Sequence, residues 1–211
     1  MANRNLVENL FESIRLCRSS KYNIYLIGSR LWGTNTKTSD WDLLIVSQLT
    51  MKEQLSNVHK CQYDVKLMDQ QQFIEQVKEG SIIEVICYLL NKQEMIEHSF
   101  DFQSIEINLD KVNSWLNQRQ NKDLEKAKKF WIKSNRKSAW KILRHILHSR
   151  AIYNYLQQQN IHDQHFNLTI EQIQTILQPA TLLCQQDWIS LEWNQLLPLF
   201  NQAFDQLQNT T

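Results

Sequence analysis

The sequence predicts an α+β protein, with a mixed sheet near the N-terminus followed by an all-helical C-terminal part. Two observations support this class. Short runs with strand character occur only within the first 70 residues, and from about residue 110 onward the apolar residues recur at helical spacing. With 42% hydrophobic residues, three glycines and two prolines in 211 residues, the chain can bury a substantial core and has no disordered composition.

The N-terminal elements alternate between helices and strands. Apolar spacing predicts a helix over residues 3–19 and a second one over 51–60. Short apolar runs predict three strands, over 23–28, 40–46 and 63–69. Two further helices are expected on either side of Gly80, which is placed to end the first of them as its C-cap.

The remainder of the chain carries only helical patterns. They cover residues 108–120, 122–159, 169–186 and 191–208. The stretch 98–108 has no clear period, so we place a boundary there. The expected organisation is a first domain over residues 1–100 and a helical domain over 101–211, packed together because no Gly/Ser-rich linker separates them.

Composition excludes several classes of protein. The formal net charge is +1, so no global field favours nucleic acid or a membrane surface. The four cysteines lie far apart without a C-x-x-C pair, which argues against a disulfide framework or a zinc site. The N-terminus does not resemble a signal peptide, and no apolar run reaches the ~18 residues of a membrane span. We therefore expect a cytoplasmic protein with no membrane partner.

One motif combines glycine with hydroxyl and carboxyl groups. Gly28 and Ser29 end the first predicted strand and open a helical turn, where backbone N–H groups and the helix dipole attract phosphate oxygens. Glycine allows close approach of the backbone to a phosphate, and the Ser29 hydroxyl can donate to the same anion. The turn therefore predicts a phosphate-binding site.

Ten residues separate Ser29 from two aspartates at alternate positions. Asp40 and Asp42 point to the same face of the second strand, where they repel each other unless a cation lies between them. Asp64, which opens the third strand, joins them if that strand lies alongside. Such carboxylates suit Mg²⁺, and three can hold two ions about 3.5–4 Å apart. The alternative is that the aspartates have only structural roles, with Asp40 in a turn and Asp42 exposed on the strand. The preceding Gly-Ser turn and the following apolar strand make this alternative less favourable than metal binding.

The segments Gly28-Ser29, Gly33 and Ser39-Asp40-Trp41-Asp42-Leu43 resemble the signature of the DNA polymerase beta-like nucleotidyltransferase superfamily, over residues 22–69. The resemblance implies a nucleotidyltransferase palm that transfers a nucleoside monophosphate from a nucleoside triphosphate (NTP) to a hydroxyl group and releases pyrophosphate. By the same resemblance, the expected nucleotide-binding residues of this segment are Gly28, Ser29, Arg30 and Ser39. The expected ligands of Mg²⁺ or Mn²⁺ and catalytic residues are Asp40, Asp42 and Asp64, with Asp64 activating the acceptor hydroxyl.

A weaker likeness reaches beyond the palm. Residues 69–90 and 137–156 resemble nucleotidyltransferases that are associated with RNA ligases. The resemblance would give functional roles to Glu84, Lys137 and Arg144.

The second long helical segment is strongly basic, with no Asp or Glu between residues 126 and 150. If the helix is continuous, one face carries Lys126, Lys129, Lys133, Lys137, Lys141, Arg144 and His148. Such a stripe suits a triphosphate or an RNA backbone, and a solvated basic face is the alternative. We expect the triphosphate to contact Lys137, Lys141 and Arg144, because "KSNRKS" is a candidate helix break before them. His145 and His148 are expected at the surface rather than as ligands, and most tryptophans are expected in the core.

Three functions remain open at this stage. The first is a Mg²⁺-dependent nucleotidyltransferase whose acceptor is RNA, a protein or a small molecule. The second is an antitoxin-type nucleotidyltransferase that adenylylates a partner toxin, whose motif spacing fits equally well. The third is a nucleotide-binding protein of the same fold without turnover, which the complete set of three acids disfavours.

Overall fold

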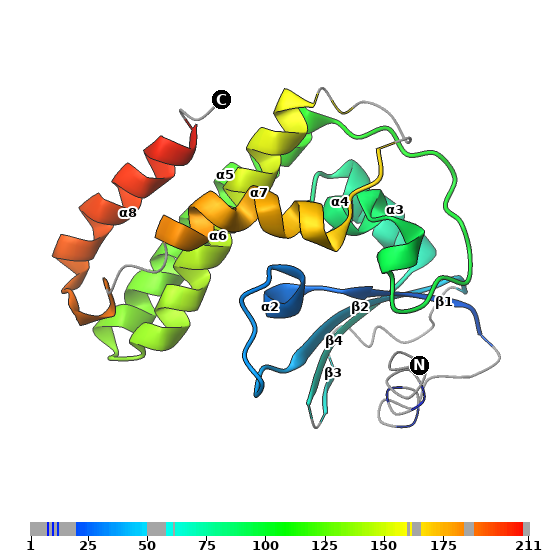
Figure 1. The fold of residues 1–211 in the computed structure, drawn as a ribbon, viewed down its shortest axis with the longest axis horizontal. Coiled ribbons are helices and arrows are strands. Elements are labelled where there is room, and N and C mark those ends of the chain that lie inside the picture. Colours follow the sequence, from blue (N-terminus) through cyan, green and yellow to red (C-terminus); the bar gives the residue numbers. More distant parts are fainter. Residues whose placement is uncertain are drawn as a thin grey trace.

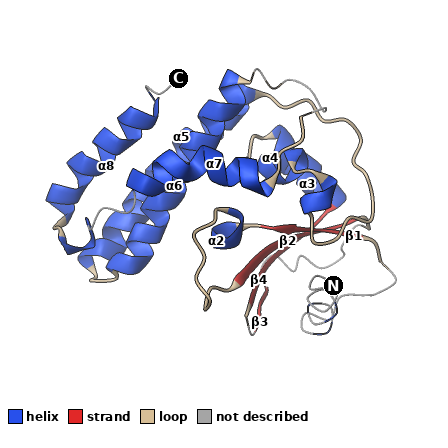
Figure 2. Ribbon diagram, viewed as in Figure 1, coloured by secondary structure: helices blue, strands red, loops and turns tan. Residues whose placement is uncertain are grey.

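The computed structural model describes residues 20–49, 58–60, 62–159, 161, 166–183 and 188–208, together with residues 8, 10 and 12. Figure 1 and Figure 2 show one small sheet with helices gathered mainly on one side of it. The predicted α+β class is therefore confirmed. The elements in chain order are β1 (Tyr22–Leu26), α2 (Gly28–Leu31), β2 (Trp41–Ser47), β3 (Val58–Lys60), β4 (Tyr63–Asp69), α3 (Gln70–Lys78), α4 (Ile82–Leu89), η1 (Lys92–Glu94), α5 (Leu109–Ile132), α6 (Arg136–Gln158), α7 (Ile170–Leu183), η2 (Trp188–Ser190) and α8 (Trp193–Gln208).

The sheet has the strand order β1-β2-β4-β3. The central strands β2 and β4 are parallel, whereas β1 pairs antiparallel with β2 and β3 pairs antiparallel with β4. The three predicted strands are confirmed to within two residues at each end. The predicted helix over 51–60 is wrong at its end, because residues 58–60 form β3; a short apolar run does not distinguish the two structures. Residues 51–57 and most of the predicted helix 3–19 lie outside the described residues.

Side-chain alternation gives the sheet two buried faces. Leu43 and Ile45 of β2 pack on one face with Leu10 of the N-terminal segment. Leu44 and Val46 point the other way, into the core that the helices form. Asp42 precedes Leu44 by two residues, so its side chain lies at the end of the sheet on the helical face.

Two helix ends fix how the helices cover this face. Asp69, the last residue of β4, caps α3: its Oδ1 accepts the N–H of Gln72, and the Gln72 side chain accepts the N–H of Asp69. The predicted end of α3 at Gly80 is confirmed by its left-handed φ of 80°. A Cβ at Gly80 would lie 2.5 Å from the nitrogen of Val112, so glycine also allows α5 to pack at this point.

The basic segment forms parts of two helices rather than one. Helix α5 ends at Ile132, Ser134 takes a left-handed φ of 60°, and α6 begins at Arg136. The N-caps Asn108 and Asn135 accept N–H groups of the first turns of α5 and α6. The break foreseen at "KSNRKS" is therefore confirmed, and the two long helices lie side by side (Figure 1).

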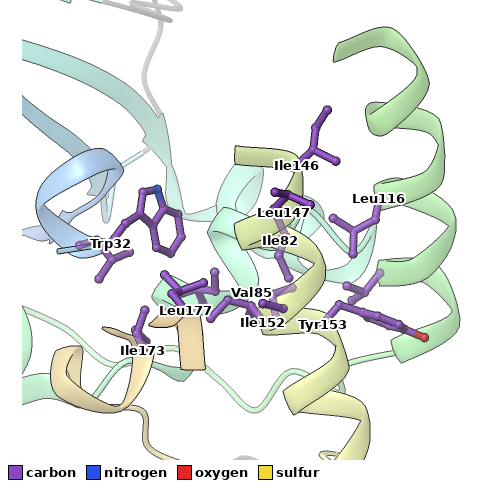
Figure 3. Close-up of a cluster of buried hydrophobic side chains, with 14 of the residues drawn as sticks. Trp32, Ile82, Val85, Leu116, Ile146, Leu147, Ile152, Tyr153, Ile173 and Leu177 are labelled. Carbon is purple, nitrogen blue, oxygen red and sulfur yellow. The ribbon is translucent and has the colours of Figure 1, made fainter. Parts of the chain in front are cut away.

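One hydrophobic core joins the sheet and the helices. It includes Tyr25 of β1 and extends without interruption to Leu207 of α8. Figure 3 shows its centre, where Trp32, from the turn after α2, lies close to side chains of α4, α6 and α7. The boundary near residue 100 stays a prediction, but the segments on its two sides share this core.

Candidate active site

Asp42 and Asp64 are direct neighbours on the two parallel central strands. The register of β2 and β4 pairs Asp42 with Asp64, and both residues are partly buried. Neighbouring strands lie about 4.8 Å apart, so the two carboxyl groups start from adjacent points at the same end of the sheet. The strand adjacency on which the sequence prediction depended is therefore present.

Gly28 packs directly against Asp42. The N–H of Ile27 donates to the backbone oxygen of Asp42 at 2.9 Å, and the N–H of Ser29 donates to its Oδ2 at 3.4 Å. Gly28 has a left-handed φ of 64°, and a Cβ there would lie 2.0 Å from Asp42 Oδ2. The glycine thus keeps the space in which the Asp42 carboxylate lies. Helix α2 is a single turn, so the predicted phosphate cradle is a short one.

Arg30 supports the loop that carries Asp40. Its Nη2 donates to the Ser39 carbonyl at 2.7 Å and its Nε to the Asp40 carbonyl at 3.2 Å. The guanidinium also lies 4.1 Å from the ring centre of Trp41. These contacts give Arg30 a structural task in the motif, and direct contact with a nucleotide stays a prediction.

The electrostatics of the site centre on Asp42. Burial is the main cause that raises the pKa of this carboxyl, and the charges of Asp64 and Asp40 raise it further. Lys141 and the N–H of Ser29 act in the opposite direction. The other two predicted acids therefore act on Asp42, and α6 brings a cation, Lys141, to it.

Two adjoining cavities meet at this point. The larger has a volume of about 490 Å³ and the smaller about 290 Å³. Both are lined by Asp42, Lys141, Trp32 and His145. Of the predicted residues, the larger cavity also contains Gly28 and Asp64. The smaller one also contains Ser29, Ser39, Asp40, Lys137 and Arg144. Except for Arg30, every predicted site residue therefore lines at least one of the two.

The break before α6 divides the predicted basic stripe. Lys126, Lys129 and Lys133 belong to α5 and its end and are exposed. The smaller cavity is instead lined by the four stripe members on α6: Lys137, Lys141, Arg144 and His148. The single stripe was expected only for a continuous helix, and the foreseen break at Ser134 divides it.

The two histidines do not lie at the surface as expected. His148 is buried, and His145 is partly buried between the two cavities. Burial lowers the pKa of His148 to about 3 and that of His145 to about 4, assisted by nearby cations that include Arg144. The helical pattern did not reveal this, because α7 covers the face of α6 that carries His148.

The larger cavity contains an ion pair that sequence reasoning did not place there. Lys66 Nζ lies 2.6 Å from Oε1 of the fully buried Glu84, whose other oxygen accepts the Ser81 hydroxyl. Alternation along β4 puts Lys66 on the same face as Asp64, and this signal was available in the sequence. Arg119 and Asp123 of α5 form a second pair in the cavity wall, at 2.9 Å.

The residues present fit a divalent cation held partly by substrate. Among the described residues, no group of three or more His, Cys, Asp or Glu side chains is arranged to hold a metal ion by itself. Mg²⁺ is usually bound by one or two carboxylates together with substrate phosphates, and the adjacent carboxylates of Asp42 and Asp64 suit that arrangement. Asp42 and Asp64 are the residues that would hold it, whereas Asp40 is exposed and is not gathered with them into a three-residue metal group.

Comparison with known proteins identifies the family of the chain. The nucleotidyltransferase domain family matches residues 10–134, more than half of the chain, and the protein therefore belongs to that family. A solved structure of a nucleotidyltransferase-like protein from Exiguobacterium sibiricum is 12% identical and has a TM-score of 0.31, over 95% of this chain and 75% of that one. No curated protein matches the chain. None of the helices in the described part is long and apolar enough to cross a membrane.

Proposed function

We propose that the protein transfers a nucleoside monophosphate from an NTP to a hydroxyl acceptor, with Mg²⁺ or Mn²⁺ as the required cation, and releases pyrophosphate. Family membership supports nucleotidyl transfer in general. The observation that carries the finer proposal is the pairing of Asp42 with Asp64 where two cavities meet, opposite the cations of α6.

The two cavities suggest where the reactants lie. The smaller one has hydroxyl and cationic side chains, which suit the triphosphate, and includes Ser29, Lys137 and Arg144. The larger one contains Asp64 and has a partly apolar wall, which suits the acceptor. Asp42 lines both, as expected for a residue at the reacting α-phosphate.

The chemistry follows from these positions. The acceptor oxygen attacks the α-phosphorus while its proton passes to the Asp64 carboxylate, and the bond from the α-phosphorus to the pyrophosphate oxygen breaks. Lys141 and Arg144 neutralise charge on the departing pyrophosphate. When bound, the metal would stabilise the negative charge that develops on the α-phosphate and on the leaving group.

Replacement of the paired acids tests the proposal. We expect Asp42→Asn and Asp64→Asn each to lower pyrophosphate release at least about 100-fold, because each removes a charge at the reacting centre. The measurement is pyrophosphate release and transfer of label from α-³²P NTPs, in a cell extract that supplies acceptors. Asp101→Asn is the matched control, since it makes the same chemical change at an exposed residue that pairs with Lys92.

The fold of the variants is checked separately. Burial destabilises the charged form of Asp42, and the asparagine of D42N carries no charge. We therefore expect D42N to be at least as stable as the wild type. Mg²⁺ should raise the Tm of the wild type but not that of D42N, because binding to the folded state stabilises it. Full turnover in both acid variants would refute the proposal. Metal-dependent NTP binding without pyrophosphate release would instead identify a nucleotide-binding protein that lacks turnover.

A further inference from the structure

Three buried polar atoms of the described residues have no hydrogen-bond partner: Trp32 Nε1, Arg144 Nε and His148 Nδ1. All three residues line the smaller cavity. Buried polar groups in native proteins are nearly always paired, so three orphans around one cavity indicate a ligand that completes them. Trp32 and His148 are 4% and 2% exposed, which makes both side chains part of a built site rather than of the surface.

The chemistry of these atoms defines what such a ligand must offer. The indole Nε1 and the guanidinium Nε can only donate. The imidazole of His148 is neutral at pH 7, because burial depresses its pKa to about 3. Its Nε2 lies 3.3 Å from the Thr181 hydroxyl, and when that hydroxyl donates to Nε2 the ring carries its proton on Nδ1. Each of the three residues that line the cavity then carries an N–H donor without a partner, and a ligand that completes them must be rich in acceptor oxygens.

The position of the three donors narrows the class of ligand that fits the smaller cavity. Trp32 belongs to the turn that follows α2, and its backbone N–H donates to the Gly28 carbonyl at 3.1 Å. Its ring meets the His148 ring edge-on, with centroids 6.1 Å apart. Lys137 and Lys141 line the same cavity on one side and Asp40 and Asp42 on another, which suits a polyphosphate bound together with a divalent cation.

We infer that Trp32 and His148, together with Arg144, donate N–H groups to the triphosphate of the bound NTP in the smaller cavity. The inference rests on the proposed function and adds two binding residues to it. It assigns the smaller cavity to the triphosphate and leaves the larger one to the acceptor. Figure 3 shows Trp32 next to the core of α6 and α7, so this contact also links the palm loop to the helices.

An NMR titration of the full-length protein tests the inference directly. In a ¹H–¹⁵N spectrum each of the seven tryptophans gives one indole signal. Magnesium tripolyphosphate is expected to shift the Trp32 signal, which W32F identifies by its loss. The signal of Trp131 is the internal control, because its Nε1 already donates to the Leu191 carbonyl at 3.1 Å, and it should stay in place.

Affinity provides the second measurement. By calorimetry, W32F should weaken tripolyphosphate binding about tenfold, since a hydrogen bond to a charged group contributes about 1.5 kcal/mol. R144K keeps the positive charge but lacks the guanidinium Nε, and should weaken binding several-fold. R144K does not open a space in the core. It therefore replaces W32F as the test of binding if circular dichroism shows that W32F is unfolded.

The outcomes separate this inference from the proposed function. An unmoved Trp32 signal on saturation with tripolyphosphate, or a shift caused by adenosine instead, would overturn the inference even if the acid variants lose transfer. A shift of Trp32 with no NTP turnover in any condition would sustain the inference and reject the proposed reaction.

Discussion

Gly28 is the residue at which a single added carbon is expected to have the largest effect on the site. Its missing Cβ leaves room for the carboxylate of Asp42, with 2.0 Å between the two positions. Gly33 is a natural comparison, because it has a nearly equal left-handed φ of 68° but faces the end of the flexible Gln174 side chain, at 3.0 Å. Alanine would therefore strain the backbone to a similar degree at both positions, but its Cβ would meet Asp42 at one position and Gln174 at the other.

We predict that Gly28→Ala lowers nucleotidyl transfer about 100-fold, because it forces Asp42 out of position by about 1 Å or more. Gly33→Ala should keep turnover within about threefold of the wild type. Both should lose about 1 kcal/mol of stability from the left-handed backbone. Steady-state kinetics and urea unfolding of the two variants measure these effects, and equal losses of activity would contradict the account.

The sequence predicted the acids of the site better than its donors. Alternation placed Asp40 and Asp42 on one face of their strand, but the approach of Asp64 was conditional on the pairing of the two strands, which is a tertiary contact. Trp32 and His148 could not be recognised in the same way. Trp32 looks like a core residue in its own segment and His148 like a surface member of the basic stripe, and their shared cavity exists only because α6 packs over the turn after α2.

At the scale of elements, the separation of α5 from α6 decides which cations serve the site. Lys141 lies on α6, lines both cavities and acts on the Asp42 charge. Lys129 lies on α5, is exposed and lines neither of these cavities. The two lysines carry the same charge within one basic segment of the sequence, so they form a matched pair.

We predict that Lys141→Ala raises the KM for NTP about tenfold, as expected for the loss of one charge-assisted contact to a phosphate. Lys129→Ala should leave KM and kcat unchanged. Initial rates over a range of NTP concentrations distinguish the two. If both substitutions raised KM equally, the total positive charge of the protein would matter rather than the position of Lys141 on α6.

The boundaries of helices and strands show which elements could be predicted from sequence patterns alone. Strong apolar periods gave β4, α7 and α8 almost to the residue. The short strand β3 was missed, because three residues carry too little pattern and its pairing with β4 is a tertiary contact. The position of the break after α5 was foreseen, together with its consequence that the basic stripe is divided.

At the scale of the whole molecule, the buried histidines of α6 couple stability to pH. The unfolded chain protonates these residues near pH 6.5, whereas the folded chain does so only near pH 4 for His145 and pH 3 for His148. Between those values the unfolded state binds more protons. Stability therefore falls as the pH is lowered from about 6.5 to 4.

We predict that the free energy of unfolding decreases over this range by up to about 1.4 kcal/mol per pH unit for each such histidine. His148→Gln should reduce the slope, because glutamine does not titrate and can still accept from Thr181. Urea unfolding at pH 7, 6 and 5 gives both slopes. The buried histidines would not be the cause if the wild type were equally stable at pH 5 and 7. The same conclusion would follow if His148→Gln left the pH dependence of the free energy of unfolding unchanged.

The parallel pairing of β2 with β4 has a consequence for how this protein can be altered. Because Asp42 and Asp64 face each other by strand register, the chain between Ser47 and the start of β3 at Val58 can be lengthened without changing the distance between them. One residue inserted inside either strand would instead turn the carboxylate toward the opposite side of the sheet. Grafted sequences and tags therefore belong in that connection, while the two strands tolerate only substitution.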